Sequence, residues 1–230
     1  KGYFTNKFLQ EERTDCVYEL FELDTIGAFP LLLQQYPDLV GLNVTIPYKK
    51  EVLAYVTQVH ADVAAIGAAN TLRLRNGAIE AFNTDWIGFR DSLLPMLGAE
   101  RPAALVLGTG GAAAAVCYAL QQIGISFKSV SRTGTNEVLA YNALNAEIIA
   151  AHPLIVNTTP LGTSGADVDQ YPQLPYEAVG PQHLLYDLVY NPDVTAFLRK
   201  GQEQGARIKN GYEMLVLQAE AAWSIWNTAL

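Results

Sequence analysis

From residue 104 onward, short apolar runs alternate with helical spans, and this alternation constrains the fold more than any other feature of the chain. It is typical of βαβ units, in which helices cover both faces of a parallel sheet. Strands are predicted at residues 104–107, 127–130, 154–157, 184–189 and 207–209, and helices up to residue 123 and at residues 136–150 and 194–204. The sequence therefore predicts an α/β fold whose second half is a doubly wound parallel sheet.

The part of the chain before residue 104 has a mixed pattern. Helices are predicted near residues 1–12, 25–36 and 49–59, and strands at residues 17–22 and 39–44. Two β-type runs, 68–74 and 79–82, are joined through Asn76-Gly77, a pair typical of a tight hairpin. Residues 163–175 are polar and contain proline, which favours a loop. The last span, 212–229, has apolar residues at helical spacing and predicts a closing helix.

Composition and charge narrow the class of partner. Half of the 230 residues are hydrophobic, so the chain can bury a substantial core. The net charge of -8, without clusters of Lys and Arg, disfavours nucleic acid and anionic membrane surfaces and favours a small-molecule ligand. Cys16 and Cys117 lie far apart and predict no disulfide framework, and no apolar run approaches the roughly 18 residues that cross a bilayer. We expect a cytoplasmic protein, either a monomer or a homodimer.

A glycine loop follows the predicted strand at 104–107 and opens a helix. Its pattern, Gly108-x-Gly110-x-x-Ala113, stands in the context that the dinucleotide fingerprint requires. Glycines allow a tight turn and a close backbone approach, and the helix N-terminus offers free N–H groups to a pyrophosphate. The alternative is a tight strand-to-helix turn that binds nothing.

The end of the next strand predicts which dinucleotide is bound. An NAD-binding protein would place Asp or Glu there, whereas this chain has Ser131-Arg132-Thr133. A guanidinium can hold the 2′-phosphate of NADP, so NADP is favoured, although Arg132 could also be an ordinary surface arginine. Thr158, at the end of the following strand, is expected either along the cofactor or in a capping role.

The first half offers candidate acid-base residues. Lys49 follows a strand end and a proline turn, close to Asn43 and Thr45, which can hydrogen-bond a substrate hydroxyl. An ammonium can stabilise and protonate the oxygen left by hydride transfer to a ketone, but Lys49 could also be merely solvated. Asp85 could accept from a substrate hydroxyl or cap the next helix, and Asn70 could contact substrate or form a turn. The three histidines have no metal-ligand spacing, and no metal is expected.

Together these strings resemble the shikimate dehydrogenase family, in the order of that family and over nearly the whole chain. The matching strings are NVTIPYK (43–49), GAANT (67–71), NTDWIG (83–88), GTGG (108–111), SRT (131–133), NTTPLG (157–162), YDLVYNP (186–192) and NGYEMLVLQA (210–219).

The resemblance implies NADPH-dependent, reversible reduction of 3-dehydroshikimate to shikimate, a step of aromatic amino-acid and chorismate biosynthesis. It implies a substrate domain formed by residues 1–88 and 212–230, to which the C-terminal helix returns, and a Rossmann-type NADP domain formed by residues 89–211. By motif position the site residues are the catalytic pair Lys49 and Asp85, the substrate contacts Thr45, Asn70, Tyr190 and Gln218, and the NADP contacts Gly108, Gly110, Gly111, Arg132 and Thr158.

The chain departs from the family pattern in two places. The Ser-x-Ser motif that holds the substrate carboxylate has no match, and because the chain begins at Lys1-Gly2 rather than at methionine, we expect this motif either upstream or replaced by another anchor. No further basic residue follows Arg132 within residues 134–137. Two other functions stay open at this point: a quinate/shikimate dehydrogenase with broader cofactor use, and a non-catalytic metabolite sensor.

Overall fold

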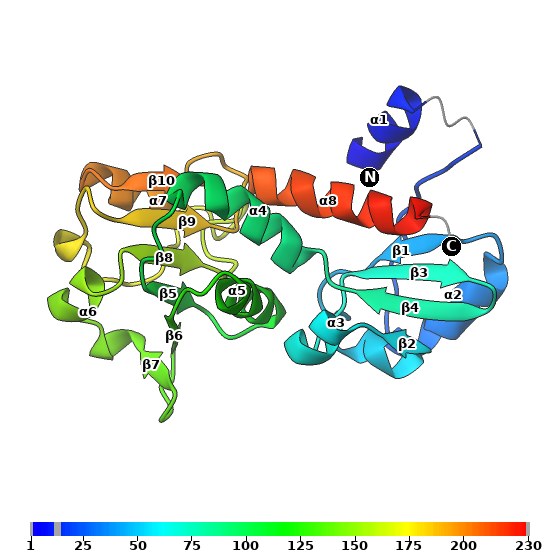
Figure 1. Cartoon of the computed structure of the whole chain (residues 1–230), viewed down its shortest axis with the longest axis horizontal. Helices are drawn as coiled ribbons and strands as arrows, with labels where there is room; N and C mark the ends of the chain where they lie inside the picture. The colour runs from blue at the N-terminus through cyan, green and yellow to red at the C-terminus, as the bar shows by residue number, and fades with distance from the viewer. Residues whose placement is uncertain (1, 12–14, 229–230) are drawn as a thin grey trace. The chain divides into compact units, whose positions relative to one another are not determined.

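The chain forms two compact units. The computed structural model describes residues 2–11 and 15–228 (Figure 1). The first unit comprises the described residues up to Thr84 and from Val216 onward, and the second comprises Asp85–Leu215. Among the described helices, none combines the length and the apolarity that crossing a bilayer requires.

The first unit is built on a small mixed sheet with the strand order β1, β3, β4, β2. Strand β3 is antiparallel to β1 and β4, and β2 is parallel to β4. The predicted hairpin is confirmed, because Asn76 and Gly77 join β3 to β4 with φ angles of 51° and 77°, as a tight two-residue turn requires. The elements are α1 (Gly2–Gln10), η1 (Ile26–Ala28), α2 (Phe29–Gln35), β1 (Gly41–Asn43), η2 (Glu51–Tyr55), β2 (Gln58–Val59), α3 (Ala61–Ile66), β3 (Thr71–Arg75) and β4 (Ala78–Phe82).

The last helix, α8 (Tyr212–Asn227), packs against the first unit over most of its length. Ala219 and Ala222 are buried in one cluster with Phe4 of α1. Trp226 donates its indole N–H to the carbonyl of Leu72 at 2.9 Å. The same indole leaves no room for a side chain on β1, because a Cβ at Gly41 would lie 2.2 Å from its nitrogen. The helix therefore packs directly on the sheet within one unit.

The second unit contains a six-stranded sheet, and all of its neighbouring strands are parallel. The order β7, β6, β5, β8, β9, β10 is that of the Rossmann fold, and it reverses between β5 and β8 (Figure 1). The elements are α4 (Asp85–Leu97), β5 (Ala104–Leu107), α5 (Gly111–Gln122), β6 (Phe127–Ser131), β7 (Val138–Ala140), η3 (Tyr141–Ala143), α6 (Ala146–Ala150), β8 (Leu154–Asn157), η4 (Tyr176–Ala178), β9 (Leu184–Asp187), α7 (Ala196–Glu203) and β10 (Arg207–Lys209).

Alternate residues of the central strands face two separate cores. Val106 of β5 packs in one cluster with side chains of α4 and α5. Leu107 of the same strand packs in a second cluster with Ile149 of α6 and Phe197 of α7. Helices thus cover both faces of the sheet, and the doubly wound architecture predicted from the alternating pattern is confirmed.

Three local predictions were wrong. Residues 17–22 are not a strand, because no ladder bond joins them to a sheet in the part of the chain that the structure describes. Residues 136–150 are not one helix: the apolar run at β7 joins the edge of the sheet, and the side chain of Asn145 starts a new helix by accepting from the N–H of Ile148. The span 49–59 forms only the short η2 before β2.

A buried carboxylate ties together the ends of β8, β9 and α7. The side chain of Asp187, at the end of β9, has no solvent exposure. It accepts hydrogen bonds from Nδ2 of Asn157 at 2.9 Å, from the N–H of Val189 at 3.0 Å and from Oγ1 of Thr195 at 2.5 Å. Burial raises the pKa of Asp187 from 3.8 to about 6, against the opposing effect of these three donors.

This raised pKa gives the stability a defined pH dependence. The folded chain holds the Asp187 proton up to about pH 6, whereas the unfolded chain releases it near 3.8, so ionising Asp187 destabilises the fold as the pH rises through this interval. We expect the free energy of unfolding of the wild type to fall by about 3 kcal/mol between pH 4 and pH 7 relative to that of an Asp187→Asn variant, whatever constant offset separates the two proteins. Urea denaturation of both proteins across this range measures the difference. A difference that does not change with pH would contradict the burial argument.

Candidate active site

The glycine loop lies between the end of β5 and the N-terminus of α5. Gly108 has a φ of +115°, and a Cβ there would lie 2.5 Å from Oγ1 of Thr158. At Gly110 and Gly111, by contrast, a Cβ would meet no described atom within 4 Å. Gly110 is the N-cap residue of α5 and has no side chain that could bond the N–H groups of the first turn. Open space in front of exposed N–H groups fits the pyrophosphate of a dinucleotide.

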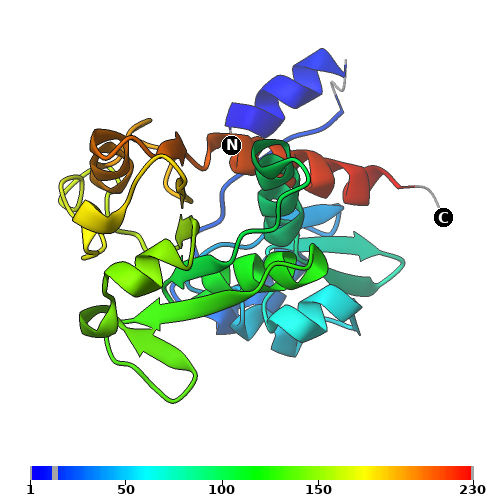
Figure 2. The same ribbon diagram turned by 60° about the vertical axis from the view of Figure 1, so that its left-hand side comes forward.

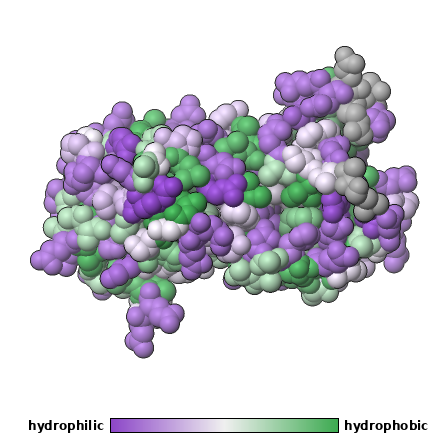
Figure 3. All heavy atoms as spheres, viewed as in Figure 1, coloured by the Kyte–Doolittle hydropathy of each residue, from purple (hydrophilic) through white to green (hydrophobic). Residues whose placement is uncertain are grey.

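Arg132 follows β6 directly and is exposed. It begins the turn between β6 and β7, which Figure 2 shows extending below the sheet. The same turn is drawn as hydrophilic at the lower edge of Figure 3. Residues 131–134 contain no carboxylate, so nothing in this turn's first residues would repel a 2′-phosphate. An arginine at this position, without a nearby carboxylate, fits NADP better than NAD.

Thr158 holds the loop after β8 against the end of β5. Its Oγ1 donates to the carbonyl of Leu107 at 2.6 Å, and its N–H donates to the same oxygen at 3.0 Å. The structure therefore brings Thr158 to the glycine loop, where the Cβ position of Gly108 points at it. Its hydroxyl thus bonds the end of β5.

A buried polar cluster lies at the strand ends of the first unit. Asn70 accepts from the N–H of Thr84 at 2.7 Å through Oδ1, and its Nδ2 donates to Oγ1 of Thr84 at 2.9 Å. Gln218 of α8 accepts through Oε1 from the same Nδ2 at 3.4 Å and from Oγ1 of Thr84 at 3.2 Å. Thr71 and Asn43 extend the cluster, since Nδ2 of Asn43 donates to Oγ1 of Thr71 at 3.4 Å. The cluster thus joins two predicted substrate residues, Asn70 and Gln218.

A backbone hydrogen bond connects Lys49 to the segment that carries Asn70 of this cluster. Its carbonyl accepts from the N–H of Ala69 at 2.8 Å, and its side chain is partly buried. Thr45, four residues earlier, is exposed in the turn that follows β1. The turn therefore sets Lys49 next to the residue that precedes Asn70.

The other two predicted site residues belong to the second unit. Asp85 begins α4 directly after Thr84 and is only 9% exposed. Tyr190 follows β9 and is 43% exposed, with its ring centroid 6.5 Å from that of Tyr212. Within the described ranges, no group of three or more His, Cys, Asp or Glu side chains could hold a metal ion.

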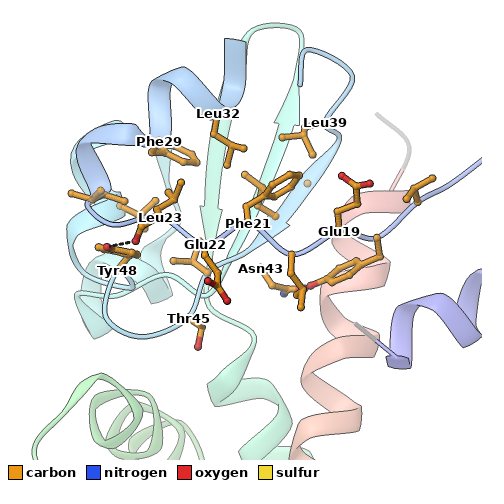
Figure 4. A pocket seen from close by; sticks show the side chains of 18 residues that line it. Glu19, Phe21, Glu22, Leu23, Phe29, Leu32, Leu39, Asn43, Thr45 and Tyr48 are labelled. Atoms are coloured by element: carbon orange, nitrogen blue, oxygen red, sulfur yellow. Dashed lines mark hydrogen bonds between the residues drawn. The ribbon is translucent and has the colours of Figure 1, made fainter. Parts of the chain in front are cut away.

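The first unit also contains a cavity of about 330 Å³ between residues 17–23 and β1. Figure 4 shows apolar side chains around it, among them Phe21, Phe29 and Leu32. The hydroxyl of Tyr48 donates to the carbonyl of Leu23 at 2.6 Å on one side. Glu19 and Glu22 supply negative charge at the lining, so the cavity suits an anionic substrate poorly.

Several residues of the site were missed in the sequence. Thr84 is fully buried at the centre of the polar cluster, and Tyr18 donates to Oδ1 of Asn43 at 2.9 Å. Asn157 and Asp187 are buried behind the loop that carries Thr158. The sequence signals were the presence of Thr84, Asn157 and Asp187 in the strings NTDWIG, NTTPLG and YDLVYNP, and the position of Asn157 and Asp187 at the carboxyl ends of parallel strands.

The conformation of the glycine loop gives a direct test of its geometry. We expect Gly108→Ala to destabilise the fold by about 1–3 kcal/mol, because alanine is strained at this φ and its methyl group would meet Thr158. Gly110→Ala is the matched control: its φ of -82° and open surroundings predict a loss below about 1 kcal/mol. Urea denaturation midpoints check both. Equal losses would show that the loop does not adopt this conformation.

Known proteins resemble this chain over most of its length. A profile of the shikimate dehydrogenase substrate binding domain matches residues 3–72. The chain is 33% identical to a shikimate dehydrogenase (NADP(+)) of Caldicellulosiruptor bescii, over 97% of this chain and 83% of the relative. It is 34% identical to that of Aquifex aeolicus, over 97% of this chain and 85% of the relative.

The resemblance extends to solved structures. The shikimate 5-dehydrogenase of Thermus thermophilus, in complex with NADP(H) and shikimate, superposes with a TM-score of 0.85 at 30% identity. The match covers 99% of this chain and 88% of the other. Identity at this level across both units confirms the family indicated by the motifs: the chain belongs to the shikimate dehydrogenase family.

Proposed function

We propose that this chain catalyses the NADPH-dependent, reversible reduction of 3-dehydroshikimate to shikimate, a step of chorismate and aromatic amino-acid biosynthesis. The observation that carries the proposal is the buried cluster of Asn70, Thr84 and Gln218 in a member of this family. Amide and hydroxyl groups held in fixed orientations are suited to a substrate with several hydroxyl groups. We assign most of the substrate contacts to residues 1–88 and 212–230, and NADP binding to residues 89–211.

In this proposal, Lys49 and Asp85 form the catalytic pair. Bound NADPH would supply the hydride. Reducing a ketone leaves negative charge on its oxygen, and the Lys49 ammonium would stabilise this charge and deliver the proton. The Asp85 carboxylate would accept a hydrogen bond from a substrate hydroxyl.

The remaining residues would bind and orient. Thr45, Asn70, Tyr190 and Gln218 would contact the substrate through hydroxyl and amide groups. The backbone of the glycine loop at Gly108, Gly110 and Gly111, together with Arg132 and Thr158, would hold the dinucleotide. We further propose that the enzyme works in the cytoplasm, as a monomer or a homodimer.

Two neighbouring lysines allow a matched test of the acid-base role. We expect Lys49→Ala to lower kcat by about 10²- to 10⁴-fold, the usual effect of removing a positioned proton donor. The bond with Ala69 should persist in this variant, because it uses the backbone carbonyl of Lys49. Lys50→Ala, which removes the lysine next to it, should leave kcat within about twofold. Steady-state absorbance of the nicotinamide with shikimate and NADP measures both. Full turnover by Lys49→Ala would remove this lysine from the mechanism.

Cofactor preference tests Arg132. We expect Arg132→Ala to lower kcat/KM for NADP by about 10- to 100-fold, because a charge-assisted hydrogen bond to the 2′-phosphate is lost. The value for NAD should change by less than about twofold, since NAD lacks that phosphate. Lys128→Ala, at an exposed position on β6, controls for the loss of a positive charge from the second unit. An equal fall in kcat/KM for NADP and for NAD would mean that Arg132 does not bind the 2′-phosphate.

A further inference from the structure

Asp187 bonds none of the predicted site residues, but one of its partners, Asn157, precedes the predicted cofactor residue Thr158. We propose that Asp187 is a positioning residue for NADP: it fixes the loop after β8, so that Thr158 is held against the glycine loop at Gly108. The inference rests on the proposed function, since it concerns the same dinucleotide site.

The surroundings of Asp187 are arranged for an acceptor. All three of its partners donate: Nδ2 of Asn157 and the N–H of Val189 to Oδ1, and Oγ1 of Thr195 to Oδ2. An ionised carboxylate is the only side chain of this size that accepts at both positions without donating. An asparagine would place an N–H toward one of these donors and leave that donor without an acceptor.

The bond between Asp187 and Asn157 connects this carboxylate to the loop after β8. With its Nδ2 held by Asp187, Asn157 presents Oδ1 to the loop. That oxygen accepts from the N–H of Thr159 at 3.0 Å and from its Oγ1 at 2.7 Å. Because amide orientation is fixed by both ends, turning the amide would remove all of these bonds at once.

Thr158 lies between the two residues that this network fixes. Its N–H and Oγ1 reach the carbonyl of Leu107 only while the loop keeps its course between Asn157 and Thr159. The same Oγ1 is the atom nearest to the Cβ position of Gly108. A loop released from Asp187 would shift Thr158 and change the shape of the space at the N-terminus of α5.

The test compares Asp187→Asn with Asp193→Asn, which removes a carboxylate from a position nearby in the sequence. NADPH binding is measured by nicotinamide fluorescence, and the KM for shikimate is measured at saturating NADP. We expect Asp187→Asn to weaken NADPH binding about tenfold and to leave the KM for shikimate within about twofold, while Asp193→Asn changes neither. Unchanged NADPH binding in a folded Asp187→Asn variant would overturn the inference, as would an equal loss for shikimate.

A second variant tests the path itself, including the case in which Asp187→Asn does not fold. Thr159→Val keeps the shape of the side chain and the backbone N–H bond to Asn157, but it removes the hydroxyl's bond to Asn157 and a longer one that the hydroxyl accepts from the N–H of Leu161. It should weaken NADPH binding in the same direction. In the double variant the two effects should be less than additive, because both act through Asn157. Wild-type affinity in Thr159→Val, or full additivity, would contradict the path. A wild-type protein that binds no NADPH would instead refute the proposed function.

Discussion

The pairing of β5 with β6 on one side and β8 on the other is the constraint on which the cofactor half of the site depends. The strand order reverses at this point, which is where open α/β sheets bind ligands outside the carboxyl ends of their strands. Backbone bonds fix the loops there: the N–H of Gly108 donates to the carbonyl of Val130 at 2.8 Å, and the N–H of Thr158 donates to the carbonyl of Leu107. The glycine loop is thus held by three neighbouring strands.

In the first unit, the polar side chain of Asn70 is oriented by a backbone hydrogen bond. The backbone N–H of Thr84 can only donate, so it fixes Oδ1 of Asn70 and turns Nδ2 toward Oγ1 of Thr84 and Gln218. A buried amide held at both ends keeps one orientation before any ligand arrives. The orientation of the Asn70 amide is therefore fixed by the backbone N–H of Thr84 and not by a charged group.

Periodicity and local motifs predicted the second unit well. Its central strands are continuous apolar runs, such as Leu154–Asn157, because both faces are covered, and the glycine loop is a local pattern. The strand predicted at 17–22 failed because strand formation needs a partner that local sequence does not specify. The partners of Asp187 could not be predicted either, since Asn157 and Thr195 reach it through the register of β8 and the start of α7. Contacts between distant segments follow from packing, which periodicity does not encode.

The membership of α8 in the first unit has a consequence for biosynthesis. The sheet of that unit is complete by Phe82, but the helix whose Trp226 fills the space over Gly41 follows the whole second unit in the chain. During translation, the β1 surface must therefore stay uncovered while the whole second unit leaves the ribosome and folds. The unit whose synthesis begins first can therefore complete its packing only after the second unit has been made.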